Sequence, residues 1–254
     1  MASSDKVPGA CPARNGDKKI PPGDPMAATT VMLDKGTAMM QSLKPIKQMS
    51  QHLCSFALHS HDPSRQIEAH FYVQRVNQDF LQSAVYDSNS SSAHLIGVEY
   101  MVSEKLFNTL PPEEQKLWHS HQYELSFAGS DRSPSHSKGS GACRHARTPK
   151  HCQNLRQVLV HVADRPRVNI SGDRLPLGPP ALMMSPQDVN MGRIKPELVK
   201  KRDDAYGIST ESILTTRGSI TGPEVKNPNA DYWVEHGKGF AIDIVETDMK
   251  KTAP

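Results

Sequence analysis

The sequence has no apolar run long enough to cross a bilayer, which takes about 20 consecutive apolar residues. Its most apolar stretch, Leu95–Val102, is far shorter and contains Glu99. Residues 1–19 carry charges and prolines but no apolar run, so we expect no secretory signal. The sequence therefore predicts neither a membrane-spanning segment nor export.

Cysteines and aromatic residues are also scarce. Aromatic residues make up 6% of the 254 residues and hydrophobic residues 36%, beside 20 prolines, so part of the chain is not expected to form core. We expect a disordered tail over residues 1–30 and one domain over residues 31–250. No CxxC spacing occurs, which favours a cytosolic protein with reduced cysteines: Cys11, Cys54, Cys143 and Cys152.

The excess of basic residues belongs to one segment. The net charge is +3, yet residues 125–172 alone carry eight Lys/Arg and two Asp. The rest of the chain is slightly acidic. The composition therefore does not indicate a nucleic-acid partner for the whole protein.

Residues 37–58 show apolar positions every three or four residues, which predicts an amphipathic helix that Pro45 kinks or splits. Two interpretations remain open: the helix packs on a core, or it lies on a lipid surface with Lys44 and Lys47 near the headgroups. His59 and His61 are expected to cap its end. The candidates for lipid contact are Met39, Leu43, Ile46, Met49 and Phe56.

Strand patterns follow this helix. Residues 64–86 are expected to be largely extended, because Ile67, Ala69, Phe71 and Val73 alternate with polar side chains. A Ser-rich turn separates them from a second strand pattern at 94–102, which predicts an antiparallel hairpin. Short helices are expected over 103–119 and 195–206, and a last strand over Phe240–Val245. The predicted fold class is α+β, with an antiparallel sheet and flanking helices.

Several long blocks of this sequence resemble the second subgroup of the plant oil-body-associated protein family, which is also catalogued as a domain of unknown function. The blocks cover most of residues 32–124 and 173–245: SRQIEAHFYVQRVNQDFLQSAVYDS, HLIGVEYMVSEKLFNTLPPEEQKLWHSHQYE, DRLPLGPPALMMSPQ, PELVKKRDDAYGI and NPNADYWVEHGKGFAIDI. The resemblance implies a place at the surface of oil bodies, facing the cytoplasm, and a part in keeping them small and stable. It implies no catalytic residues and no cofactor.

The resemblance stops between Glu124 and Asp173. Ser, Arg, His and Gly dominate this stretch, which predicts a basic, disordered loop over residues 125–172. A second hypothesis is that the segment is out of frame. Permissible codons for Gln153–Arg167, read one base later, give RTYGKFWCTWQTDR, and the family has a similar aromatic segment at this place.

Two histidines and a carboxylate could carry chemistry. In an extended chain His119 and His121 point to one face, and with Glu124 they form a candidate divalent-metal set, for which His70 or Glu68 could supply a further ligand. The alternative is a hydrogen-bonded polar cluster. No GxSxG elbow or phosphate-binding glycine loop is present in the sequence.

Three functions follow from these patterns. The first is a non-enzymatic, peripheral protein of the lipid-droplet surface. The second is a metal-dependent enzyme that uses His119, His121 and Glu124. The third is an interaction module that droplet proteins recruit.

Overall fold

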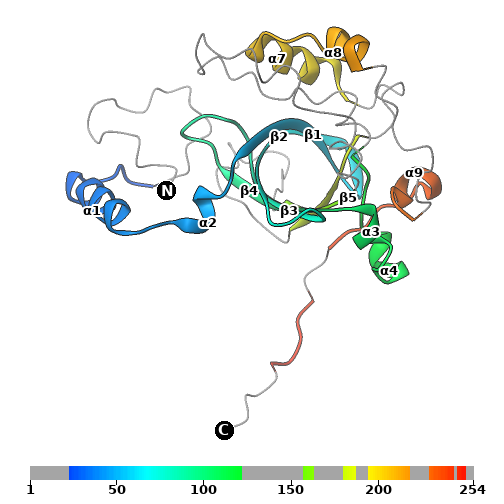
Figure 1. Cartoon of the computed structure of the whole chain (residues 1–254), viewed down its shortest axis with the longest axis horizontal. Coiled ribbons are helices and arrows are strands. Elements are labelled where there is room, and N and C mark those ends of the chain that lie inside the picture. Colours follow the sequence, from blue (N-terminus) through cyan, green and yellow to red (C-terminus); the bar gives the residue numbers. More distant parts are fainter. Residues whose placement is uncertain are drawn as a thin grey trace.

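The computed structural model describes residues 23–121, 157–162, 180–186, 194–217, 229–242 and 245–249, with the backbone alone at 157–162. Six antiparallel strands close into a barrel in which each strand pairs with the next and the last pairs with the first. The strands are β1 (Gln51–His59), β2 (Asp62–Arg75), β3 (Phe80–Tyr86), β4 (Leu95–Val102), β5 (Gln157–Val162) and β6 (Ala181–Met184). The predicted α+β class is confirmed, and Figure 1 shows the ring of strands with helices around it.

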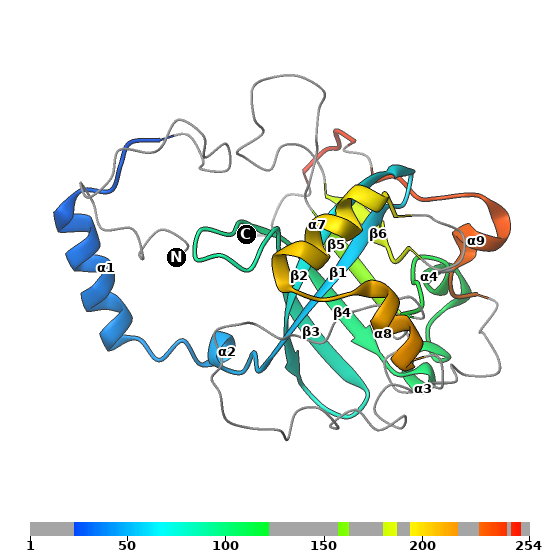
Figure 2. The same ribbon diagram turned by 90° about the horizontal axis from the view of Figure 1, so that it is seen from above.

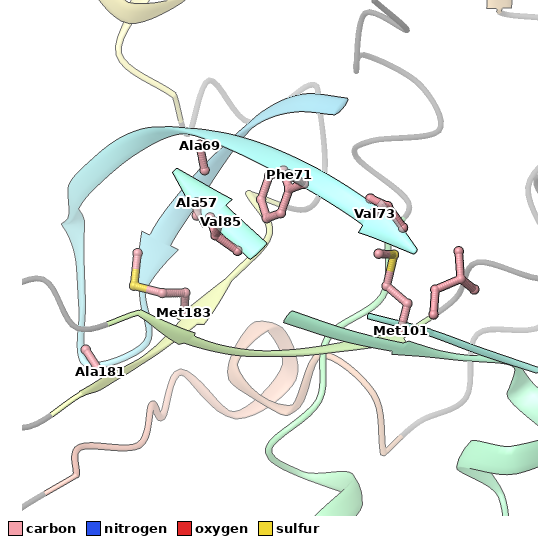
Figure 3. Close-up of a cluster of buried hydrophobic side chains, with 9 residues drawn as sticks. Ala57, Ala69, Phe71, Val73, Val85, Met101, Ala181 and Met183 are labelled. Atoms are coloured by element: carbon pink, nitrogen blue, oxygen red, sulfur yellow. The ribbon is translucent and has the colours of Figure 1, made fainter. Parts of the chain in front are cut away.

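Alternate residues of the strands fill the barrel. Along β2, for instance, Ala69, Phe71 and Val73 point inward, as the period of two predicts, and all three are buried. The same face continues through β3 and β4 by the register that pairs Phe71 with Val85 and Leu81 with Met101. Figure 3 shows this core: Ala57, Ala69, Phe71, Val73, Leu81, Val85, Met101, Ala181 and Met183.

Helix α7 (Pro196–Tyr206) lies over the outer face of β1 and β2, and α8 (Thr210–Arg217) follows it (Figures 1 and 2). Pro196 at the first helical position and Gly207 in the left-handed conformation after the last turn explain where α7 begins and ends. Phe56 and Leu58 of β1 pack beneath it with Ile194, Leu198 and Val199.

The predicted helix over residues 37–58 is wrong in its second half. Residues 51–59 form β1, and only α1 (Ala28–Met40) and the single turn α2 (Lys44–Lys47) are helical. Every residue from Cys54 to His59 is buried, because one face of β1 lines the barrel and much of the other is covered by α7. His59 ends this strand, so it does not cap a helix. The helix α1 also begins inside the tail predicted for residues 1–30.

One end of the barrel carries α3 (Glu104–Phe107), α4 (Pro112–Gln115) and α9 (Tyr232–His236). The Ser103 side chain accepts from the Leu106 amide and caps α3. Phe107 and Trp118 are the buried centre of this end, with their rings 6.5 Å apart. The strand predicted at Phe240–Val245 is wrong, because residues 240–242 and 245 are irregular.

Residues 157–162 form a strand within the segment predicted to be a disordered loop. As β5, they pair with β4 on one side and with β6 on the other. The sequence of this segment, QVLVHV, explains why it forms a strand, because it has β-branched valines at alternate positions. The remainder of 125–172 and residues 1–22 lie outside the described residues.

Candidate functional site

Helix α1 exposes most of its large apolar side chains. Met32 is 74% exposed, Leu33 69%, Met39 88% and Met40 83%, whereas Val31 is buried. Met32 and Met39 are seven residues apart, as are Leu33 and Met40, so they form a continuous stripe along one side of the helix. Figure 1 shows α1 at a distance from the barrel, and an unpartnered apolar stripe of this kind indicates a surface that contacts something else.

The stripe leads into a groove beside the barrel. Helix α2 contributes Ile46, which is 60% exposed, and half-buried Met49 follows it. Opposite them lie Tyr72 of β2, Tyr86 of β3 and Leu95 of β4, with the two tyrosine rings in edge-to-face contact at 5.5 Å. The groove has a volume of about 490 Å³ and is lined mainly by apolar atoms.

We call the exposed side chains of α1 together with this groove the α1–α2 surface. Its basic side chains are Lys35, Lys44 and Lys47, all exposed, and Asp34 is also exposed. Apolar side chains bordered by lysines are the usual composition of a segment that lies in a lipid interface.

The five residues that the sequence predicts for lipid contact divide between this surface and the core. Met39 and Ile46 are exposed, while Leu43 and Met49 are half-buried. Phe56 is only 1% exposed and packs under α7, so a place on the lipid-contacting face is wrong for it. The helical spacing that grouped Phe56 with the others breaks where the strand β1 begins.

The predicted metal residues His119 and His121 lie at the end of the barrel near α4. Their rings stack with centroids 5.6 Å apart. His119 is 3% exposed, and its Nδ1 has no hydrogen-bond partner among the described residues. Burial, together with the charge of His121, holds the pKa of His119 well below its ordinary value, so the ring is neutral at physiological pH. Glu124 lies outside the described residues.

The carboxylate beside His121 is Glu99, which the sequence did not assign to this cluster. Glu99 is 2% exposed and lies on the inward face of β4, two residues before Met101. The Ser83 hydroxyl donates to its Oε2 at 3.0 Å, and its Oε1 is 3.6 Å from His121 Nε2. In the sequence, the only indication of this role is that Glu99 is the single charged residue of the apolar stretch Leu95–Val102. The described part of this cluster is a buried polar network that anchors the chain after α4 to the barrel.

Residues from the C-terminal part of the chain hold the segment that follows α4 in place. Asp231 accepts from the Ser120 amide at 2.9 Å and from the Ser120 hydroxyl at 2.5 Å. Asn229 donates to the Gln115 side chain at 2.7 Å. These bonds join segments more than 100 residues apart in the chain, and they fix Ser120, which lies between His119 and His121.

Comparison with known proteins gives a consistent result across the chain. The family described as a protein of unknown function (DUF1264) matches residues 43–221. Two relatives from Arabidopsis thaliana, oil body-associated proteins 2B and 2A, are 62% and 59% identical to the chain. A relative from Zea mays, oil body-associated protein 2A, is 48% identical. Each alignment covers 100% of this chain and 99% of the relative. No solved structure matches the chain.

Proposed function

The chain belongs to the oil-body-associated protein family, in its second subgroup, and from this premise we propose that it associates peripherally with the surface of oil bodies. It contacts the droplet from the cytoplasmic side and contributes to droplet stability or biogenesis without catalysing a reaction. Among the described residues no helix is long and apolar enough to cross a membrane, which supports a peripheral mode of contact.

The observation that carries this proposal is the α1–α2 surface. Burying one Met, Leu or Ile side chain completely contributes about 1.5–3 kcal/mol. The four exposed apolar side chains of α1 and Ile46 of α2 therefore supply several kcal/mol even when they enter a lipid monolayer only in part. Lysines near an anionic lipid surface add about 1 kcal/mol each. Together these contributions are sufficient for reversible binding.

Flotation with artificial droplets tests the proposal directly. Purified full-length protein is mixed with protein-free droplets that have a triacylglycerol core and a phospholipid monolayer, and the droplets are floated through a density gradient. The variant Met39→Gln/Met40→Gln keeps the side-chain length and the helix propensity but removes the apolar character. We expect most of the bound fraction to be lost.

A matched control carries the same change elsewhere. Met249 is 93% exposed and lies far from α1 in the sequence, so Met249→Gln should float like the unchanged protein. If the double variant floats as well as the control, the α1–α2 surface is not the contact. If the unchanged protein binds native oil bodies but not protein-free droplets, a droplet protein recruits it, and direct lipid binding is refuted.

A further inference from the structure

A second cluster of polar side chains lies on the outer face of the barrel, beneath the end of α7. In the register of β1 and β2, Cys54 is opposite His70, and Glu68 is two residues before His70. Because Ala69 and Phe71 point into the barrel, Glu68 and His70 point outward. Cys54 is 9% exposed and His70 1% exposed, and Glu68 is half-buried.

The three side chains converge on one point. One atom of each, the sulfur of Cys54, a carboxylate oxygen of Glu68 and a ring nitrogen of His70, lie within 4.8 Å of one another. Glu68 Oε1 is 3.3 Å from His70 Nε2 and accepts from Cys54 Sγ at 3.7 Å. In a tetrahedral zinc site, bond lengths near 2.0–2.3 Å place neighbouring ligand atoms about 3.3–3.6 Å apart. The observed separations are close to these values.

The other nitrogen of His70 has the partner that a metal-binding histidine requires. His70 Nδ1 is 3.0 Å from His52 Nε2. When Nδ1 carries the proton and donates to His52, Nε2 presents a lone pair toward the carboxylate of Glu68. Such a second hydrogen bond is the common way in which proteins fix the orientation and the tautomer of a histidine ligand.

Either a proton or a metal ion can occupy the space between Glu68 Oε1 and His70 Nε2. In the tautomer that carries its proton on Nδ1, the His70 lone pair and the Glu68 carboxylate face each other and repel unless a cation lies between them.

We propose that Cys54, Glu68 and His70 form a binding site for a divalent transition-metal ion, with Zn²⁺ the best match to this set of one sulfur, one nitrogen and one oxygen ligand. The Tyr206 hydroxyl, 3.3 Å from His70 Nε2, stands beside the fourth coordination position. Tyr206 is the last residue of α7, so a bound ion stabilises the packing of this helix on β1 and β2. The site is separate from the α1–α2 surface and does not depend on droplet binding.

Cobalt provides a spectroscopic test, because a thiolate bound to Co²⁺ gives an intense near-ultraviolet charge-transfer band. The starting protein is the full chain with Cys11→Ser, Cys143→Ser and Cys152→Ser, which leaves Cys54 as the only thiol. We expect one equivalent of Co²⁺ to produce the band and Zn²⁺ to displace it. The same equivalent of Zn²⁺ should raise the midpoint of thermal unfolding, because a ligand that binds only the folded state stabilises it.

Substitutions distinguish ligands from their neighbours. Cys54→Ser should abolish the band, and Glu68→Gln, which preserves shape, should weaken Co²⁺ binding strongly. His52→Phe removes the nitrogen that pairs with His70 Nδ1 and should weaken binding about 10- to 100-fold without removing the band. The control is His94→Gln, since His94 Nδ1 is paired with Asp87 at 3.3 Å, a histidine–carboxylate pair that lacks the third ligand. We expect this control to bind Co²⁺ unchanged.

Two results would overturn the proposal. One is a Co²⁺ affinity that is unchanged in the Glu68→Gln and Cys54→Ser proteins, which would place the ion elsewhere. The other is a starting protein that is folded by circular dichroism but binds neither Co²⁺ nor Zn²⁺. In that case a proton occupies the space between Glu68 and His70, and the cluster is only a hydrogen-bonded network.

Discussion

His59 should make the stability of this protein depend on pH, and the substitution His59→Gln should reduce that dependence. The side chain is fully buried at the end of β1, and neither ring nitrogen has a hydrogen-bond partner among the described residues. Burial, and after it the positive charges of Arg65 and His61, lower the pKa of His59 from 6.5 to about 4, while the charge of Asp62 opposes them. The folded protein therefore holds this ring in its neutral form.

The direction and the size of the effect follow from proton linkage. Above pH 6.5 the ring is neutral in both states, and the stability is fully present. As the pH falls from 6.5 toward 4, the unfolded chain takes up a proton that the folded chain does not, so the free energy of unfolding decreases. Between pH 7 and pH 5 this decrease amounts to about 2 kcal/mol from His59 alone.

Urea unfolding at pH 8, 7, 6 and 5 measures this contribution. At pH 8 His59 is neutral in both the folded and the unfolded state. The difference in the free energy of unfolding between the unchanged protein and His59→Gln then reports only the packing cost of the substitution. We expect the unchanged protein to lose about 2 kcal/mol more than His59→Gln between pH 7 and pH 5. If the free energy of unfolding falls equally in both proteins between pH 7 and pH 5, the conclusion that the fold holds the His59 ring neutral is refuted.

Two further predictions concern the fold, and a third concerns the coding sequence. Phe56→Ala should lower the free energy of unfolding by about 3–5 kcal/mol in a denaturant titration, whereas Ile46→Ala, on the surface, should change it by less than about 0.5 kcal/mol; equal losses would contradict the strand assignment of β1. A Cβ on Gly239 would overlap the Ser60 carbonyl, so Gly239→Ala should cost about 1–3 kcal/mol, and an unchanged midpoint of thermal unfolding would contradict that close contact. Sequencing of the transcript across 124–173 should yield an open frame that encodes the aromatic run, and codons that cannot do so would refute the frame hypothesis.

Strands with one face in the barrel and the other partly exposed could be predicted from the sequence. In β2, Ala69, Phe71 and Val73 are buried, and their alternation with polar side chains is visible in the sequence. The hairpin of β3 and β4 was predicted from two strand patterns joined by a polar turn and is confirmed by their register. Helix α7 was predicted as a short helix over residues 195–206, and its bounds of Pro196–Tyr206 agree with that range.

Strand β1 could not be recognised in this way. Its residues from 54 to 59 are buried on both faces, so apolar side chains occur without a period of two and coincide by chance with a helical spacing. Only the tertiary contact with α7 explains the burial of its outer face. A local pattern cannot contain that information.

The polar clusters were predictable in type but not in membership. The sequence paired His119 and His121 with Glu124, and it offered Glu68 and His70 as additional ligands. The barrel instead places Glu99 beside His121, and the register of β1 and β2 sets Cys54 opposite His70 and near Glu68. These pairings depend on register, which no spacing within one segment reveals.

The register of β5 also bears on the segment that departs from the family. In the alternative frame, positions 157–162 would read KFWCTW, with an aromatic residue at position 162. That position pairs with Gly97 of β4 and Ala181 of β6, which carry no side chain and a single methyl group. Strand pairing through the backbone serves either sequence, so the topology of the barrel is compatible with both reading frames.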